Sequence, residues 1–203
     1  MNEFSAFRQR IDKSIIIKAQ SGDRRALKSI YETFFTASFK LVYRITTSKS
    51  ASEDIVQNGF IKVLTNIAAF KHNGSFAGWL RQIMVNEALG YLRKHKKFTV
   101  ELELNPQTNE ERQSQLQSLD VANNTVFDQP WWEACNDLFV LMKDLSVGAR
   151  TVLILHEIEG YSHKEIGAFL DKTESFSKQV LARTMLKLRE QVTREEARNA
   201  SNS

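Results

Sequence analysis

The segment 159–166 carries the signals of a helix that ends, turns and starts again. Gly160 suits the residue that ends a helix, because glycine adopts the left-handed backbone conformation without strain. Ser162 and Glu165 have the spacing of a capping box, in which each side chain satisfies an unpaired amide at the start of a helix. The pattern therefore predicts a new helix that runs to about Leu170.

A short turn at residues 171–173 and a basic helix follow, which completes a helix-turn-helix unit. The basic helix carries four cationic side chains, those of Lys178, Arg183, Lys187 and Arg189. A unit of this kind places its second helix in a major groove, where such side chains contact phosphates and base edges. Double-stranded DNA is therefore the first partner to consider.

The composition restricts the fold and the type of activity. Two prolines in 203 residues and little β-branched alternation favour an all-α fold. The single cysteine, Cys135, excludes an internal disulfide and a cysteine metal cluster. The four histidines lack metal-ligand spacing, and no glycine-rich phosphate loop or nucleophile elbow occurs, so we expect no enzyme activity, no cofactor and no metal. No signal peptide or membrane-spanning run is visible, and we expect a soluble, cytoplasmic protein.

Two helical zones flank a polar segment with a different charge balance. The formal net charge is only +4, so the distribution of charge is more informative than its sum. The polar segment has six carboxylates against the single base Arg112, which is typical of a flexible acidic linker. We therefore predict two small helical domains at 1–97 and 131–192, a linker at 98–130, and a polar tail at 193–203 whose last residues, Ala197 to Ser203, fray.

Local signals place the helices of the first domain. Asp23 is a candidate N-cap, and Ser50 with Glu53 has the spacing of a second capping box, which predicts a helix from there to about Phe70. Ser75 caps a further helix that ends in the basic run 93–97.

The helix that ends near Phe70 has two distinct faces at 100° per residue. One is a narrow core stripe of Val56, Phe60, Val63 and Ile67. The other mixes polar and apolar side chains, those of Asp54, Gln57, Ile61 and Leu64. Two interpretations stay open for this second face: a broader core contact within the domain, or a docking surface for another protein.

The helix after Ser75 repeats this division. Trp79, Asn86 and Arg93 recur every seven residues, so they share one side, with Gln82 nearby. Beside the loop, this side offers the stacking, hydrogen-bonding and phosphate-binding groups that hold unstacked single-stranded bases. The alternatives are that Trp79 is a core aromatic and that the basic run is a solvated helix end.

Three segments taken in order resemble the sigma-70 superfamily of bacterial RNA polymerase initiation factors, specifically its short extracytoplasmic function (ECF) group. Residues 52–63 look like the D-x-x-Q-x-x-F-x-x-V helix of region 2, and residues 76–86 look like its F-x-x-W-L-x-x-I-x-x-N run. Residues 145–188 are similar to region 4, with its E-G-x-S-x-x-E-I-A-x-x-L pattern and recognition helix. The matches cover both helical zones.

The resemblance implies a role for each surface. It implies contact with the clamp helices of the polymerase β′ subunit at Asp54, Gln57, Asn58, Ile61 and Leu64. It implies capture of the melted −10 promoter element at Lys71, His72, Asn73, Ser75, Trp79, Gln82, Asn86 and Arg93. It implies reading of the −35 element at Ser162, Ser175, Lys178, Gln179, Ala182 and Arg183.

Departures from the family pattern occur in the −10 helix, in the turn and in the recognition helix. Gly90 stands where the family has an acidic residue, and Asp171 replaces the turn glycine, although aspartate tolerates left-handed geometry. Ser177 and Thr184 stand where small or branched apolar residues pack the recognition helix. By spacing, these two share a stripe with Leu181 and Leu188. His163, inside the capping box, is expected to be exposed.

The resemblance also implies the partners: core RNA polymerase and promoter DNA, with no small-molecule substrate and a monomeric free state. ECF factors are commonly held inactive by an anti-sigma factor, often membrane-embedded, so we expect such a partner. On the residues alone, two other functions stay open. One is a stand-alone helix-turn-helix regulator whose first domain senses a ligand or dimerises, and the other is a helical adaptor or anti-sigma-like protein.

Overall fold

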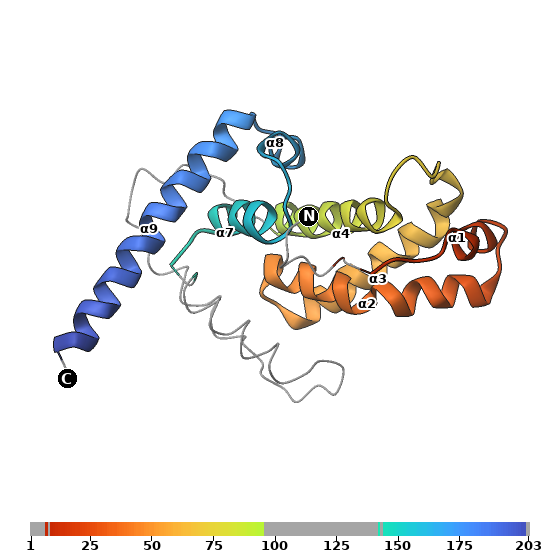
Figure 1. Cartoon of the computed structure of the whole chain (residues 1–203), viewed down its shortest axis with the longest axis horizontal. Coiled ribbons are helices and arrows are strands. Elements are labelled where there is room, and N and C mark those ends of the chain that lie inside the picture. Colours follow the sequence, from red (N-terminus) through yellow and green to blue (C-terminus); the bar gives the residue numbers. More distant parts are fainter. Residues whose placement is uncertain (1–6, 8, 96–141, 143, 202–203) are drawn as a thin grey trace. The chain divides into compact units, whose positions relative to one another are not determined.

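The computed structural model describes residue 7, residues 9–95, residue 142 and residues 144–201 (Figure 1). The chain divides into two compact units, Met1–Lys97 and Phe98–Ser203, each described here by itself. In the described ranges all regular structure is helical, which confirms the predicted all-α class. The predicted linker, Cys135 and most of the first part of the predicted second domain (residues 131–143) lie outside these ranges.

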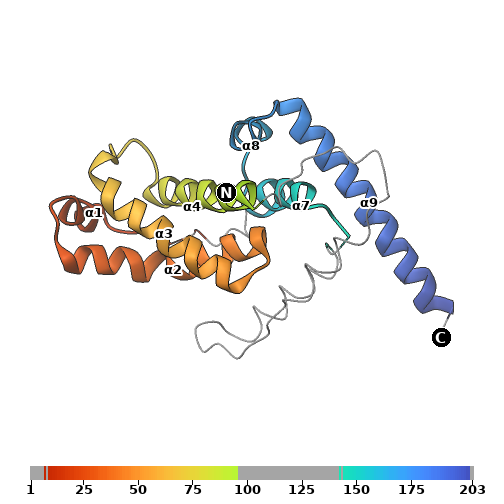
Figure 2. The ribbon, with the colours of Figure 1, turned by 180° about the vertical axis from the view of Figure 1, so that it is seen from behind.

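The first unit is built from four α-helices and one short 3₁₀ turn among its described residues. These are α1 (Lys13–Gln20), α2 (Arg24–Thr46), α3 (Lys49–Asn66), the 3₁₀ turn η1 (Ile67–Ala69) and α4 (Phe76–Lys94). Helices α2, α3 and α4 pack against one another, and α1 packs on α2 and η1 (Figures 1 and 2).

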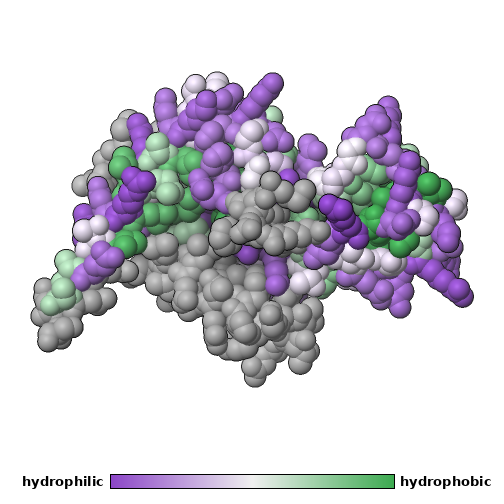
Figure 3. Space-filling view, in the orientation of Figure 1, coloured by the Kyte–Doolittle hydropathy of each residue, from purple (hydrophilic) through white to green (hydrophobic). Residues whose placement is uncertain are grey.

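The core of this unit comes from the apolar stripes of its three long helices. The predicted stripe of α3 is confirmed, since Val56, Phe60, Val63 and Ile67 are all buried. Phe34 of α2 and Met84 of α4 are also buried, and α3 packs against both of these helices. In Figure 3, hydrophobic surface also shows between hydrophilic side chains at the end of this unit that carries α1.

Side-chain caps start these helices as the sequence indicates, with one correction. The Asp23 carboxylate accepts hydrogen bonds from the amides of Arg25 and Ala26, and the Ser75 hydroxyl accepts one from Gly78. The predicted capping box of Ser50 and Glu53 is wrong, because α3 starts two residues earlier with Ser48 as its N-cap. The reason is that α2 ends at a left-handed Thr47, which leaves Ser48 as the extended residue before the new helix.

The second unit contains the elements of the predicted helix-turn-helix. They are α7 (Val147–Leu153), the π-helical turn η2 (Ile154–Ile158), α8 (His163–Leu170) and α9 (Glu174–Ser201). Both α7 and α8 pack on α9. No helix in the described ranges is both long enough and apolar enough to cross a membrane.

Helix α9 is longer than the sequence signals suggest. The segment predicted to fray from Ala197 onward continues as helix to Ser201, which corrects that expectation. Residues 193–201 contain no glycine or proline and are rich in Glu, Arg and Ala, so nothing in them stops a helix.

The buried side of α9 has the predicted composition. Ser177, Leu181, Thr184 and Leu188 are all buried. The Thr184 hydroxyl donates a hydrogen bond to the carbonyl of Val180 at 2.7 Å, so this buried polar group is satisfied within its own helix.

Candidate functional site

The second face of α3, called the α3 face below, lies on the surface of its unit. It consists of Asp54, Gln57, Asn58, Ile61 and Leu64. Ile61 is 53% exposed, Leu64 is half-buried, and the three polar residues are exposed. The interpretation of this face as a broader core contact is therefore wrong. An apolar side chain ringed by polar groups is typical of a protein-binding surface.

Helix α2 places the aromatic side chain of Tyr31 beside α3. The Tyr31 ring lies 4.8 Å from the Phe60 ring and 5.2 Å from the Phe35 ring. Tyr31 nevertheless keeps 40% of its surface exposed. The exposed apolar surface of the first unit therefore includes part of α2.

Hydrogen bonds from Gln20 of α1 fix the loop between η1 and α4. The Gln20 side-chain amide donates hydrogen bonds to the carbonyls of Ile67 at 3.0 Å and Phe70 at 2.9 Å. The Gln20 carbonyl oxygen lies 3.0 Å from His72 Nε2, and the His72 ring contacts the Phe70 ring. His72 is consequently half-buried, whereas the other predicted residues of this loop, Lys71, Asn73 and Ser75, are exposed.

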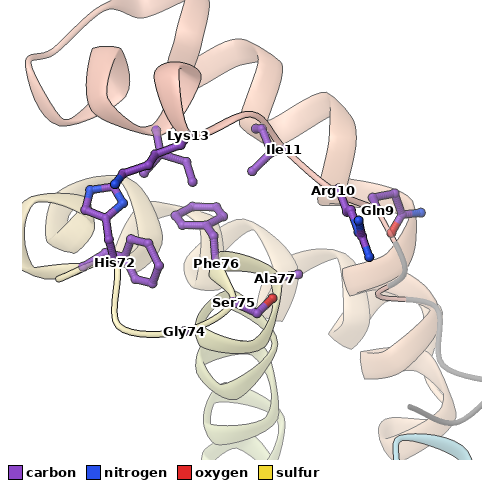
Figure 4. A pocket seen from close by; sticks show the side chains of 11 residues that line it. Gln9, Arg10, Ile11, Lys13, His72, Gly74, Ser75, Phe76 and Ala77 are labelled. Carbon is purple, nitrogen blue, oxygen red and sulfur yellow. The ribbon is translucent and has the colours of Figure 1, made fainter.

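A cavity of about 290 Å³ opens beside this loop (Figure 4). Phe70 and Phe76 supply aromatic wall. Gln9 and Arg10 lie at one end, and His72 and Lys13 lie at the other. The cavity therefore combines aromatic surface with cationic side chains at its edges, which are the groups that bind a base and its phosphate.

Trp79 is partly a core residue and partly exposed. Its ring lies 5.5 Å from each of the Phe70 and Phe76 rings, so it belongs to the aromatic cluster behind the cavity. It is still only half-buried, and Gln82, Asn86 and Arg93 on the same side of α4 are exposed. We call these four residues the α4 face. The alternative in which Trp79 is simply a core aromatic accounts for its packing but leaves its exposed part unexplained.

The helix-turn-helix of the second unit has the predicted turn chemistry. Ser162 and Glu165 form the capping box, with the Ser162 amide 2.8 Å from a Glu165 carboxylate oxygen. Asp171 ends α8 with φ of 55°, which confirms that aspartate takes the left-handed position of the turn.

The outward side of α9, called the α9 face, is exposed at every predicted position. It consists of Ser175, Lys178, Gln179, Ala182 and Arg183, and the exposed cap residue Ser162 precedes it in the unit. The Lys178 ammonium lies 2.6 Å from a Glu174 carboxylate oxygen. That contact lowers the pKa of Glu174 and holds the lysine along the helix surface.

His163 is not exposed as expected. Its ring stacks on the His156 ring with centroids 4.1 Å apart and planes 16° apart, and its Nδ1 lies 3.0 Å from the Ser177 hydroxyl. Burial, followed by the nearby His156 and Lys178, lowers the pKa of His163. The histidine therefore joins η2, α8 and α9.

Comparison with known families identifies both units. Residues 30–98 match the family model for Sigma-70 region 2, and residues 141–190 match that for Sigma-70, region 4. The ECF RNA polymerase sigma-E factor of Haemophilus influenzae is 25% identical over 165 residues, which is 80% of this chain and 85% of that protein. The sigma-E factor of Escherichia coli K12 is 26% identical over 165 residues, 80% of this chain and 84% of the relative. The chain is an ECF sigma factor of the sigma-70 family.

A solved structure shares the fold of this sigma factor. The structure of CnrH in complex with the cytosolic domain of CnrY aligns with a TM-score of 0.54 and 18% identity, over 90% of this chain and 97% of that chain. The family membership decides against the stand-alone regulator and the adaptor. Within the described ranges, no group of three His, Cys, Asp or Glu side chains could hold a metal ion.

The structural roles of two residues of this sigma factor, Gln20 and His163, do not follow from the sequence pattern. Gln20 bonds groups that lie 47 to 52 positions away, and His163 bonds Ser177 14 positions away. Neither pairing follows a helical period. The one available signal was the pair of polar residues at Ser177 and Thr184, since a buried hydroxyl needs a partner.

Proposed function

We propose that this sigma factor docks on the β′ clamp helices of core RNA polymerase through the α3 face. Ile61 supports this proposal, because a half-exposed isoleucine between exposed polar groups gains most when a partner covers it. Burial of its remaining surface, with Asp54 and Gln57 bonded at the rim, would give the combination of affinity and orientation that docking needs.

The first unit then captures the melted −10 element with the loop 71–75 and the α4 face. An extruded base leaves its stacked neighbours at a cost of a few kcal/mol. Stacking on an aromatic side chain returns ~1–3 kcal/mol per base, and cationic groups hold the phosphates. The cavity beside the loop offers aromatic wall from Phe70 and Phe76 and positive charge from Arg10 and Lys13. Single-stranded DNA is thereby favoured over the closed duplex.

The second unit reads the −35 element as duplex through the α9 face. Lys178 and Arg183 are exposed and cationic, and Gln179 between them is exposed and able to hydrogen-bond a base edge. Lys178 would exchange its contact with Glu174 for a phosphate or a base. The mechanism requires binding energy from this protein and no making or breaking of covalent bonds. Because the proposed partners, core RNA polymerase and promoter DNA, are cytoplasmic, the protein is proposed to act in the cytoplasm.

A protein that holds the factor inactive is the third proposed partner. CnrH, whose fold this chain shares, is bound to the cytosolic domain of CnrY in its structure. An inhibitor that covers the α3 face or the α9 face would block polymerase or promoter, respectively. The free factor, with neither inhibitor nor polymerase, is proposed to be monomeric.

The experiment that tests this proposal is reconstitution. The purified chain is mixed with bacterial core RNA polymerase, and run-off transcription is measured on a library of random-sequence promoters. Co-purification with the polymerase and enrichment of two spaced sequence elements are expected. If the chain binds polymerase but enriches no sequence, the assignment of the α4 and α9 faces to promoter DNA is wrong.

A further inference from the structure

The opening residue of α8, His163, lies where three elements of the second unit meet. Its ring stacks on His156 of η2 at a centroid distance of 4.1 Å. Its Nδ1 lies 3.0 Å from the hydroxyl of Ser177 in α9. One side chain therefore connects the helix before the turn with the helix proposed to read DNA.

The Ser177 hydroxyl depends on this contact. Ser177 is fully buried, in the stripe that it shares with Leu181, Thr184 and Leu188. A buried hydroxyl without a hydrogen bond is costly, because it has given up water. Among the described residues, His163 is the side chain that bonds it. The buried Ser177 hydroxyl is consequently satisfied by the His163 ring.

The other ring of the stack is itself fixed. His156 Nδ1 lies 2.9 Å from the carbonyl oxygen of Tyr161. A carbonyl oxygen only accepts, so Nδ1 of His156 carries the proton and donates it to this bond. Tyr161 directly precedes the capping residue Ser162. A continuous series of contacts therefore runs from the turn through His156 and His163 to Ser177.

We propose that His163 is a positioning residue for −35 recognition, which sets the orientation of α9 by joining His156 to Ser177. The proposal rests on the function proposed above for the second unit. His163 itself does not contact DNA in this account. Ser177 directly precedes Lys178 and Gln179 of the α9 face, so a displacement of Ser177 would move the groups that read the duplex.

The charges around the ring make this device sensitive to pH. From η2, His156 and Glu157 face it, and from α9, Lys178 and Glu174 face it. Burial is the largest influence and, with His156 and Lys178, it outweighs the two glutamates and lowers the pKa of His163 below its ordinary 6.5. The folded unit thus prefers the neutral ring. Its contribution to stability is complete above pH ~6.5 and declines as pH falls from there toward the lowered pKa, because the unfolded chain takes up the proton first.

The test uses holoenzyme made from the full chain and core polymerase. The probe is a promoter fragment selected from the random library, compared with the same fragment carrying a scrambled −35 element. The measured quantity is the ratio of the two affinities between pH 5.5 and 8. In the wild type we expect the ratio to fall as pH decreases below 6.5.

Three variants make the test specific. His163→Ala should lower the ratio about tenfold at pH 7.5 and remove its pH dependence, because a buried hydroxyl loses its partner. His163→Asn places an amide near the position of Nδ1, so it should keep the ratio at pH 7.5 and still lose the pH dependence. His95→Asn, the same change at an exposed residue of the first unit, should behave as wild type.

Folding and function are separated by two further measurements. Circular dichroism of each variant establishes that the chain is folded, and NMR titration of the His163 ring should show a midpoint that moves in Ser177→Ala. A wild-type holoenzyme without −35 discrimination would contradict the proposed function itself. A discriminating wild type, with a folded His163→Ala variant that discriminates equally well or a His163→Asn variant that keeps the pH profile, would overturn the positioning role alone.

Discussion

At the scale of single residues, the two proposed macromolecular contacts depend on side chains of opposite character. Ile61 on the α3 face is apolar and 53% exposed, so it has much surface to bury and little role in its own unit. Lys178 on the α9 face is charged and is held by Glu174 at 2.6 Å until a stronger anion replaces that carboxylate. Substitutions at the two positions should therefore affect different partners and leave stability nearly unchanged.

Ile61→Glu should weaken binding to core polymerase by about 30-fold, because a carboxylate would replace the apolar centre of the contact. The free energy of unfolding should change by less than ~0.5 kcal/mol, since the side chain is on the surface. Ile17→Glu is the matched control, because Ile17 is also an isoleucine and is 50% exposed, on α1. Affinity for core polymerase and thermal unfolding are the measurements. Equal losses in both variants would refute a specific role for the α3 face.

Lys178→Ala should weaken holoenzyme binding to a promoter with an intact −35 element by about fivefold or more, since a phosphate or base contact is lost. The slope of log affinity against log salt should decrease by about 1 if the lost contact is to a phosphate. Lys28→Ala is the control, because Lys28 makes a similar i,i+4 contact with Glu32 on the surface of the first unit. Unchanged affinity in Lys178→Ala would remove this lysine from the proposed interface.

At the scale of elements, the turn of the helix-turn-helix depends on a close backbone approach. A Cβ on Gly167 would lie 2.8 Å from the carbonyl oxygen of Lys172 and 3.0 Å from the carbonyl carbon of Thr173. These are backbone atoms of the turn, so they move only if the turn itself shifts. In this structure the absence of a side chain at Gly167 allows the close approach, while the left-handed turn position is taken by Asp171.

Gly167→Ala should therefore destabilise the second unit by ~1–3 kcal/mol, as overpacking does in a close-packed region. Gly90→Ala is the opposite control, because a Cβ at Gly90 meets nothing within 4 Å and the residue lies inside α4. That change should stabilise the first unit by ~0.5–1 kcal/mol, through lower entropy of the unfolded chain and better helix propensity. Chemical denaturation of the full chain measures the free energy of unfolding of both variants. An unchanged free energy of unfolding in Gly167→Ala would show that the turn can relax.

The elements that the sequence predicted well are those whose chemistry is local. Asp23, Ser75 and Ser162 were identifiable as caps because a cap bonds amides two or three positions ahead. Ser48 was not predicted as the cap because Ser50 with Glu53 has the S-x-x-E spacing of a capping box. Only the end of α2 decides between the two serines. The bonds of Gln20 to His72 and of His163 to Ser177 join distant positions, and no periodic pattern reports such pairs.

At the scale of the whole molecule, promoter recognition is proposed to be divided between two helical units. The first offers an exposed docking face, a cavity with aromatic and cationic walls, and the α4 face. The second offers one helix, α9, which is proposed to read duplex DNA and has only two cationic side chains on the α9 face, those of Lys178 and Arg183. Each unit alone would neutralise few phosphates, so neither should hold duplex DNA tightly at physiological salt. Sequence-specific binding should therefore require core polymerase, which brings both units to one promoter.

The most direct measurement is the affinity of one selected promoter fragment for the free chain and for its holoenzyme at the same salt concentration. The account predicts specific binding by the holoenzyme and only weak, sequence-independent binding by the free chain. Tight binding of the intact promoter by the free chain, with discrimination against a scrambled fragment, would contradict it.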